Sequence, residues 1–332
     1  MLYITTVNDK DAYTAHKTLI TDRGPNEELF VPFHLPVLEI SFLEGLKTKS
    51  SGQIIADILN MFFSCGLSGW DVDFCVGKNP IKVQTMNHKL LIAEMWHNHE
   101  AKYDYIGKAL FSKICPNQSS ADKPTEWFRI AIHIAVLFAV FGELLKQGVT
   151  ELSKPIDIAV LEGDFTAPIS AWYARKMGLP IGTIVCCCED NSSVWDLVQR
   201  GEINTGNCSH PEGLERLLQS AFGCSEVREF KKICDNGSVY SLNEDKSNLI
   251  NGTMFAAVIS KDRIPAVINS MYRTNEYFID ENTAFAYAGL QDFRTRVSTG
   301  YNGLLLAMNS PDLSLEQISK ATGVSKEQLM KR

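Results

Sequence analysis

The stretch from Pro155 to Gln199 places the strongest constraint on the fold of this 332-residue chain, because β-rich and helix-forming segments alternate along it. These segments are, in order, Ile156–Leu161, Pro168–Met177, Ile181–Cys187 and Val194–Gln199. Gly163 lies in the turn after the first of them. Strand, turn, helix, strand, helix is the pattern of a parallel, doubly wound sheet. The sequence therefore predicts an α/β protein whose ligands bind at the carboxyl ends of the strands.

Composition and charge limit the binding partners and the cellular compartment that we expect for this chain. Hydrophobic residues make up 45% of the chain, and the formal net charge of −7 argues against binding to nucleic acid or to an anionic membrane. The apolar stretch Ile130–Leu145 is interrupted by His133 and Glu143 and is shorter than a membrane span, so we expect a buried helix. Residues 1–6 lack the basic start and apolar core of a signal peptide, so we expect a cytoplasmic protein without a membrane segment.

A polar cluster follows a short predicted strand, Lys89–Met95. Taken alone, His97-x-His99 with Glu94 beside it could ligate a metal ion, because imidazole and carboxylate groups are common ligands. Residues two apart share a face only on a strand, and no third ligand group elsewhere has a supporting spacing. The nine cysteines contain no Cys-x-x-Cys pair. We therefore expect no metal site, and a metal held by His97 and His99 stays open as an alternative.

The same cluster resembles a specific catalytic segment. Residues 94–105, Glu-Met-Trp-His-Asn-His-Glu-Ala-Lys-Tyr-Asp-Tyr, are similar to Glu-Leu-Phe-His-Gly-Pro-Thr-Leu-Ala-Phe-Lys-Asp-Phe of the threonine synthase family. Further matches occur in the family's order at Leu29–Pro32, Trp127–Arg129, Glu162–Thr166, Ala174–Ile181, Leu214–Leu218 and Ile279–Ala284. Shared order over most of the chain indicates common descent. The sequence thus resembles the threonine synthases, which are fold-type II pyridoxal-phosphate (PLP) enzymes.

The resemblance implies a fold of the tryptophan synthase β-like kind, with a doubly wound, mostly parallel sheet and PLP as the cofactor. Residues 162–166 match the family's Ser-Gly-Asn-Phe-Gly loop, which holds the cofactor phosphate. The candidate cofactor-binding residues are therefore Gly163, Asp164, Phe165 and Thr166. The candidate for the Schiff-base lysine is Lys102, and the ligand cleft would be lined by Glu94, His97 and Asp104.

The lysine segment departs from the family in register. Counted without gaps from Glu94, the family's lysine falls on Asp104, and with one deletion it falls on Tyr103, beside Lys102. A shift of one residue on a helix turns a side chain by roughly 100°. Schiff-base chemistry requires an amine, so neither Asp104 nor Tyr103 can replace the lysine. Lys102 could reach a cofactor only if the loop around it compensates for the shift.

In threonine synthases a smaller subdomain lies between the lysine and the arginine-containing helix, whereas here only residues 103–127 fill that interval. The family's Thr-Ser-Gly-Asp-Thr-Gly loop, which grips cofactor and substrate, occurs nowhere in the sequence. We therefore expect the smaller, cofactor-facing subdomain to be largely missing. The predicted organisation is an N-terminal threonine synthase-like region at 1–100, a remnant of the lysine loop and deleted subdomain at 101–127, and the main α/β domain at 128–332.

Two further departures concern the groups that would touch the cofactor. Asp164 stands for the asparagine of the phosphate loop, with Glu162 close by, and carboxylates oppose a phosphate dianion. Thr166 replaces the loop's second glycine, so its side chain restricts close approach of the backbone. At residues 307–311 the family has Ser-Thr-Ala-Ser-Pro, and here Ala307 or Met308 stands for the hydroxyl that faces the pyridine nitrogen.

These departures favour a threonine synthase-like pseudoenzyme with a binding or regulatory role and no bound cofactor. One alternative is an active PLP-dependent lyase for O-phosphohomoserine or a related amino acid, with Lys102 as the Schiff base. A second is a PLP-independent site for a small molecule or metal, built from Glu94, His97, His99 and Asp164. The expected partners are a second copy of the chain or another protein, with a small molecule as a further ligand and no nucleic acid or membrane.

Overall fold

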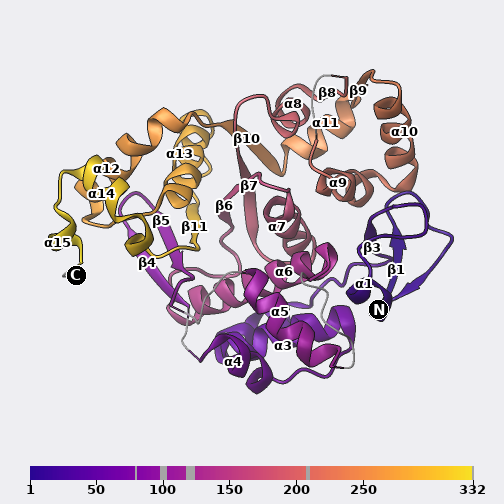
Figure 1. The fold of residues 1–332 in the computed structure, drawn as a ribbon, viewed down its shortest axis with the longest axis horizontal. Helices are drawn as coiled ribbons and strands as arrows, with labels where there is room; N and C mark the ends of the chain where they lie inside the picture. The colour runs from indigo at the N-terminus through magenta and orange to yellow at the C-terminus, as the bar shows by residue number, and fades with distance from the viewer. Residues whose placement is uncertain (79–80, 98–102, 117–123, 207–209, 331–332) are drawn as a thin grey trace.

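The computed structural model describes residues 1–78, 81–97, 103–116, 124–206 and 210–330. Its centre is a six-stranded sheet in the order β10-β7-β6-β11-β5-β4 (Figure 1). The strands are β4 (Lys82–Met86), β5 (Leu90–Glu94), β6 (Ile156–Leu161), β7 (Ile181–Cys188), β10 (Met254–Val258) and β11 (Asn302–Ala307). All neighbouring pairs are parallel except β4 with β5, which is antiparallel. The predicted α/β fold with a mostly parallel sheet is therefore confirmed.

Successive residues of the strands face opposite layers of helices, as the alternation of side chains along a strand requires. In β6, Ile158 packs with the helices α6 (Glu126–Lys146) and α7 (Thr166–Lys176), in one hydrophobic cluster. Its neighbour Ala159 packs on the other face, in the cluster that contains α12 (Ile264–Asn275) and α13 (Glu281–Arg296). Both faces are covered by helices, which is why the strands are apolar nearly throughout.

Helix α6 begins after Thr125, whose side chain caps the backbone N–H of Phe128, and it is buried along most of its length. It is the helix in the described part of the chain that is long and apolar enough to cross a membrane, and 83% of its most apolar window is buried inside the fold. The buried helix expected around Ile130–Leu145 is confirmed. The described structure is an α/β fold with this apolar helix buried in its core.

The N-terminal part adds a small antiparallel sheet, in the order β2-β1-β3, and a group of helices. The strands are β1 (Leu2–Thr5), β2 (Tyr13–Thr14) and β3 (Phe30–Pro32), and the helices are α1 (Ala15–Ile20), α2 (Ile40–Gly45), α3 (Ser51–Phe63) and α4 (Gly69–Val76). Helix α3 buries Ile54, Ile58 and Phe62 at helical spacing and begins with a capping box formed by Ser50 and Gln53. It packs directly on α6, below the sheet in Figure 1.

Between β5 and α6 the described residues form one helix, α5 (Tyr103–Ile114), and no strand. The reduction of the smaller subdomain stays a prediction, because residues 98–102 and 117–123 of this interval lie outside the described residues. The central sheet takes strands from residues 82–94 and from residues 156–307 alike. The first and third predicted regions thus share one core.

The remaining elements lie beyond the two ends of the sheet. After β7 come α8 (Ser193–Arg200), a two-stranded antiparallel sheet of β8 (Glu202–Asn204) and β9 (Val239–Ser241), and the helices α9 (Gly213–Phe222), α10 (Cys224–Asp235) and α11 (Glu244–Asn251). After β11 come α14 (Leu315–Thr322) and α15 (Lys326–Leu329), which pack near α12.

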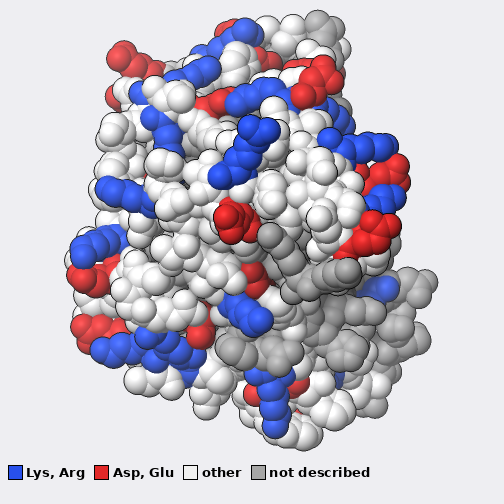
Figure 2. Space-filling view, turned by 90° about the vertical axis from the view of Figure 1, so that its left-hand side faces the viewer, with Lys and Arg blue, Asp and Glu red and all other residues white. Residues whose placement is uncertain are grey.

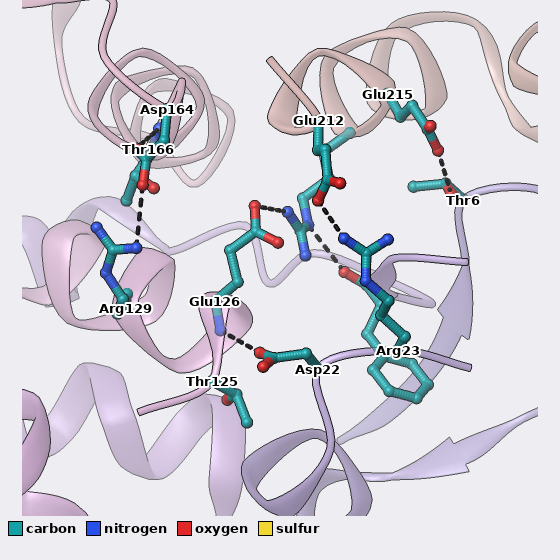
Figure 3. A network of polar contacts seen from close by, with 12 residues as sticks. Thr6, Asp22, Arg23, Thr125, Glu126, Arg129, Asp164, Thr166, Glu212 and Glu215 are labelled. Carbon is teal, nitrogen blue, oxygen red and sulfur yellow. Dashed lines mark hydrogen bonds and ion pairs between the residues drawn. The ribbon is translucent and has the colours of Figure 1, made fainter. Parts of the chain in front are cut away.

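A buried arginine ties the N-terminal sheet to the helices. Arg216 of α9 is fully buried, its Nη1 lies 2.6 Å from Glu126 of α6, and its Nε donates to the backbone carbonyl of Phe30 in β3 at 3.1 Å. Figure 3 shows the surrounding network, in which Asp22 accepts a hydrogen bond from the backbone of Glu126. Removing one partner of a buried ion pair leaves the other without compensation, which is far more costly than losing a surface pair.

We expect Arg216→Ala to lower the free energy of unfolding by about 3–5 kcal/mol, because Glu126 and the Phe30 carbonyl would lose their partner. The control is Arg200→Ala, which removes an exposed pair with Asp196 and should change stability by less than about 1 kcal/mol. Urea unfolding followed by circular dichroism measures both. Equal effects of the two substitutions would show that the buried pair does not join the segments.

Candidate functional site

The loop between β6 and α7 holds the residues that correspond to the family's phosphate loop. Gly163 has a φ of 46°, and Phe165, the N-cap of α7, is left-handed with a φ of 68°. The Phe165 N–H donates to the carbonyl of Glu162 at 2.7 Å. Pro168, in the first turn of α7, has no N–H at all. Few backbone donors of this helix end therefore remain for an incoming anion.

Asp164 occupies the helix end itself. Its Oδ1 accepts the backbone N–H of Thr166 at 3.0 Å, and its Oδ2 lies 3.0 Å from Nη1 of Arg129 on α6 (Figure 3). Partial burial acts to raise the pKa of Asp164, but the hydrogen bonds from Thr166 and the charge of Arg129 outweigh it and hold the pKa below its usual range. The positive end of α7 and the nearest guanidinium are thus neutralised by a carboxylate of the chain itself.

This loop forms one wall of an open pocket of about 570 Å³, which we call the acidic pocket. Its remaining walls come from the segments after β7 and before α9. Six carboxylates line it, against the single guanidinium of Arg129: Glu126, Glu162, Asp164, Glu189, Asp190 and Glu212. Glu162 accepts a hydrogen bond from Ser192 at 2.8 Å, and burial raises its pKa. The pocket favours cationic groups over anionic ones.

A phosphate dianion does not fit these residues. Two unit charges about 4 Å apart interact by about 1 kcal/mol in water and by about 4 kcal/mol at an effective dielectric constant of about 20. The side chain of Asp164 is 54% exposed, so its repulsion of a phosphate lies toward the lower figure. The other carboxylates of the acidic pocket add to it. The PLP phosphate site implied by the resemblance is therefore not formed by the residues present.

A second hollow of about 220 Å³ lies at the carboxyl ends of β6 and β11, and we call it the strand-end cavity. It is mostly apolar and is lined by His133, Leu137, Ala159, Val160, Leu161, Ala167, Ser170, Asn282, Ala286, Leu306 and Met308. It meets the acidic pocket at the β6–α7 loop, because Leu161 lines one and Glu162 the other. A ligand site at this edge of the sheet was predicted from the sequence.

The two candidates for the position of the family's hydroxyl, Ala307 and Met308, lie in different surroundings. Ala307 is buried in the cluster under α13, whereas Met308 lines the strand-end cavity. The group facing this cavity is thus a thioether, which cannot donate a hydrogen bond. A pyridine nitrogen placed here would meet no hydroxyl from the end of β11.

Two of the predicted cleft residues come together, but outside both hollows. Glu94, at the end of β5, is 5% exposed, and its two oxygens contact Nε2 of His97 at 2.5 Å and accept the hydroxyl of Tyr277 at 2.7 Å. Burial and the Glu94 carboxylate raise the pKa of Tyr277. Neither Glu94 nor His97 lines the acidic pocket or the strand-end cavity.

The other predicted residues of this segment cannot be placed. Lys102 and His99 lie outside the described residues, and Asp104 lies in α5 without a described side chain. Within the described ranges, no group of three or more His, Cys, Asp or Glu side chains is arranged to hold a metal ion. The metal alternative at His97 and His99 and the role of Lys102 therefore stay predictions.

Sequence reasoning missed three residues of the site. Arg129 and His133 stand one helical turn apart on α6 and face the acidic pocket and the strand-end cavity respectively. Arg129 was part of a matched segment, but no signal pointed to its pairing with Asp164. Tyr277 lies 183 residues from Glu94 in the sequence, so no local pattern could join them.

Burial, reinforced by the charge of Arg129, lowers the pKa of His133 to about 3. The ordinary pKa of a histidine is about 6.5, so below this pH His133 binds a proton in the unfolded chain but stays neutral in the folded one. We therefore expect stability to fall as the pH drops from 6.5 to 3, by at most about 1.4 kcal/mol per pH unit from this group. His133→Gln should flatten that part of a urea-midpoint-against-pH curve. His16→Gln, at an exposed position, should leave the curve unchanged, and a His133 NMR titration near pH 6.5 would contradict the prediction.

Both the sequence and the fold of this chain can be compared with those of known proteins. No known family profile matches the chain. Two curated relatives, threonine synthase-like 1 of Homo sapiens and of Pongo abelii, are each 22% identical over 182 residues, which is 50% of this chain and only 24% of theirs. The chain therefore matches about a quarter of the length of these relatives.

Solved structures share the fold across almost the whole chain. PLP-bound threonine synthase from Brucella melitensis has a TM-score of 0.77 at 14% identity and covers 98% of this chain and 92% of its own. Yeast threonine synthase has a TM-score of 0.77 at 13% identity, covering 97% and 90%. The Escherichia coli enzyme has a TM-score of 0.69 at 13% identity, covering 98% and 92%. Fold and sequence together relate this chain to the threonine synthase family.

Proposed function

We propose that this threonine synthase-like chain does not carry out PLP chemistry and acts instead by binding or regulation. The observation that carries the proposal is Asp164, whose carboxylate takes the Thr166 N–H and the Arg129 guanidinium at the helix end where a cofactor phosphate would bind. An asparagine at this position, as in the family's loop, would keep the turn without the charge. The acidic pocket around it opposes any other phosphate as well.

Two supports are independent of that charge. The residue facing the strand-end cavity after β11 is Met308, which has no hydroxyl to offer a pyridine nitrogen. The interval between β5 and α6 has room in its described residues for one helix only, so one wall of a substrate cleft is reduced. The Asp164 carboxylate at the phosphate position, the missing hydroxyl and the reduced wall all support a role without PLP chemistry.

The proposed role is carried out in the cytoplasm with a partner, which is a second copy of the chain or another protein. A nucleic acid is not proposed, because on the face drawn in Figure 2 Lys and Arg side chains are interspersed with Asp and Glu and form no continuous basic area. The one described helix that could cross a membrane is buried, which supports a role away from membranes. A small-molecule ligand is part of the proposal.

The first test is the absorbance spectrum of the purified chain with and without added PLP. We expect the sum of the protein and free-cofactor spectra, no band fixed by borohydride, and no phosphate release from O-phosphohomoserine. Lys102→Ala serves as the matched variant. A shifted near-visible band that borohydride fixes in the wild type, and that Lys102→Ala loses, would overturn the proposal in favour of an active PLP-dependent lyase.

A gain-of-binding test examines the charge argument directly. Asp164→Asn combined with Thr166→Gly restores the family's loop chemistry, so we expect PLP to bind at least about tenfold tighter than to the wild type, equivalent to about 1.4 kcal/mol. The control is Asp190→Asn, which removes a charge from the acidic pocket but not from the helix end. Fluorescence titration measures all three proteins. No gain in the double variant would mean that the loop charge is not the barrier.

A further inference from the structure

We propose that the strand-end cavity binds a small, uncharged ring compound that carries one O–H or N–H donor. This inference rests on the proposed function, because the cavity is available to such a ligand only if PLP does not fill it. The cavity belongs to the described carboxyl edge of the sheet, where ligands of doubly wound folds bind.

The size of the cavity suits one or two fused rings. Its volume is about 220 Å³. An apolar protein cavity of about 150 Å³ stays dry and binds benzene, so this one has room for a second ring. The cavity is too small for a peptide or a nucleotide, because typical pockets for drug-sized ligands begin at about 300 Å³.

The walls are apolar and are set by rigid elements. Leu137 comes from α6, Val160 from β6, Ala286 from α13 and Leu306 from β11. Two buried strands and two packed helices hold these side chains before a ligand arrives, so the cavity is preorganised. Met308 adds a thioether, which makes favourable contacts with aromatic rings. These features favour a flat, rigid ligand over a flexible one.

The charges exclude ionic ligands. His133, the one imidazole in the wall, is neutral at physiological pH because burial lowers its pKa to about 3. Among the described residues, no Asp, Glu, Lys or Arg side chain lines the cavity. A charged ligand would lose its hydration without finding a counter-ion there. An anion would also face Glu162 and Asp164 across the β6–α7 loop.

The polar residues of the wall decide which group a ring ligand can carry. The hydroxyl of Ser170, which is fully buried, donates toward the backbone carbonyls of Thr166 at 2.7 Å and of Ile130 at 3.3 Å. Asn282 brings an amide to the wall formed by α13, and an amide oxygen can accept from an O–H or N–H group on a ring.

The probe pair is 2-naphthol and 2-naphthoate, which have the same ring system and differ in charge. Isothermal titration calorimetry on the full chain should show saturable binding of 2-naphthol with a Kd of about 1 mM or tighter. We expect 2-naphthoate to bind at least about tenfold more weakly. Equal binding of the two probes, or no binding of 2-naphthol, would overturn the inference.

Two variants fill the cavity from opposite walls. Ala286→Leu acts from α13 and Ala167→Leu from α7, and each should weaken 2-naphthol binding at least about tenfold. The matched control is Ala321→Leu on α14, which fills a separate hollow between α12 and α14 and should leave binding unchanged. Circular dichroism confirms that each variant is folded. If both cavity variants fold and bind 2-naphthol as the wild type does, the site lies elsewhere and the inference fails.

The failures of the two proposals are separable. A PLP band fixed on a lysine would overturn the proposed function whatever 2-naphthol does. If PLP gives no band and 2-naphthol does not bind, the chain lacks PLP chemistry but the strand-end cavity has no ring ligand.

Discussion

Burial of helix α6 is the interaction on which the rest of the structure depends. Its apolar side chains pack against the sheet, against α3 below it and against α7 beside it. At its start Trp127 contacts Tyr3, Phe62 and Tyr173, which brings the N-terminal sheet onto the same core. One face of this helix also builds the site. Arg129, His133 and Leu137 follow each other at intervals of four residues and reach the acidic pocket and then the strand-end cavity. Packing and site geometry are therefore set by the same helix.

The fold matches that of threonine synthases, whereas the carboxylates around the β6–α7 loop oppose an anion. A parallel sheet with a helix starting after β6 offers a natural place for an anion, because backbone N–H groups and the helix dipole point there. In this chain that place is taken by Asp164, and the pocket around it is lined by carboxylates. Asp164 also contributes to the fold, since its carboxylate accepts the Thr166 N–H at the start of α7 and pairs with Arg129. Under the proposed function, this carboxylate removes the phosphate site that the same scaffold offers elsewhere, as expected where function belongs to the site and not to the fold.

The two hollows on either side of the β6–α7 loop have opposite characters for a physical reason. The acidic pocket is open, so water can solvate its charges, and Glu162, which is partly buried, has a raised pKa and accepts a hydrogen bond from Ser192. The strand-end cavity lies against the core, where an ion would be costly, and its one titratable group is held neutral. The boundary between the charged and the apolar surface thus lies between two adjacent residues, Leu161 in the strand-end cavity and Glu162 in the acidic pocket.

Local patterns in the sequence determined the order of elements, the bounds of β6 and β7 within a few residues, and the position of the β6–α7 loop. They could do so because hydrophobic periodicity and the glycine or serine residues at turns act over a few residues. They also showed that Asp164 and Thr166 depart from the family's loop. Only the tertiary structure decided that β11 lies between β5 and β6, that Met308 and not Ala307 faces the cavity, and that Arg129 pairs with Asp164. Glu94 likewise finds Tyr277 across 183 residues. Such contacts join segments that are distant along the chain, so strand order and helix packing create them, and no local spacing records them.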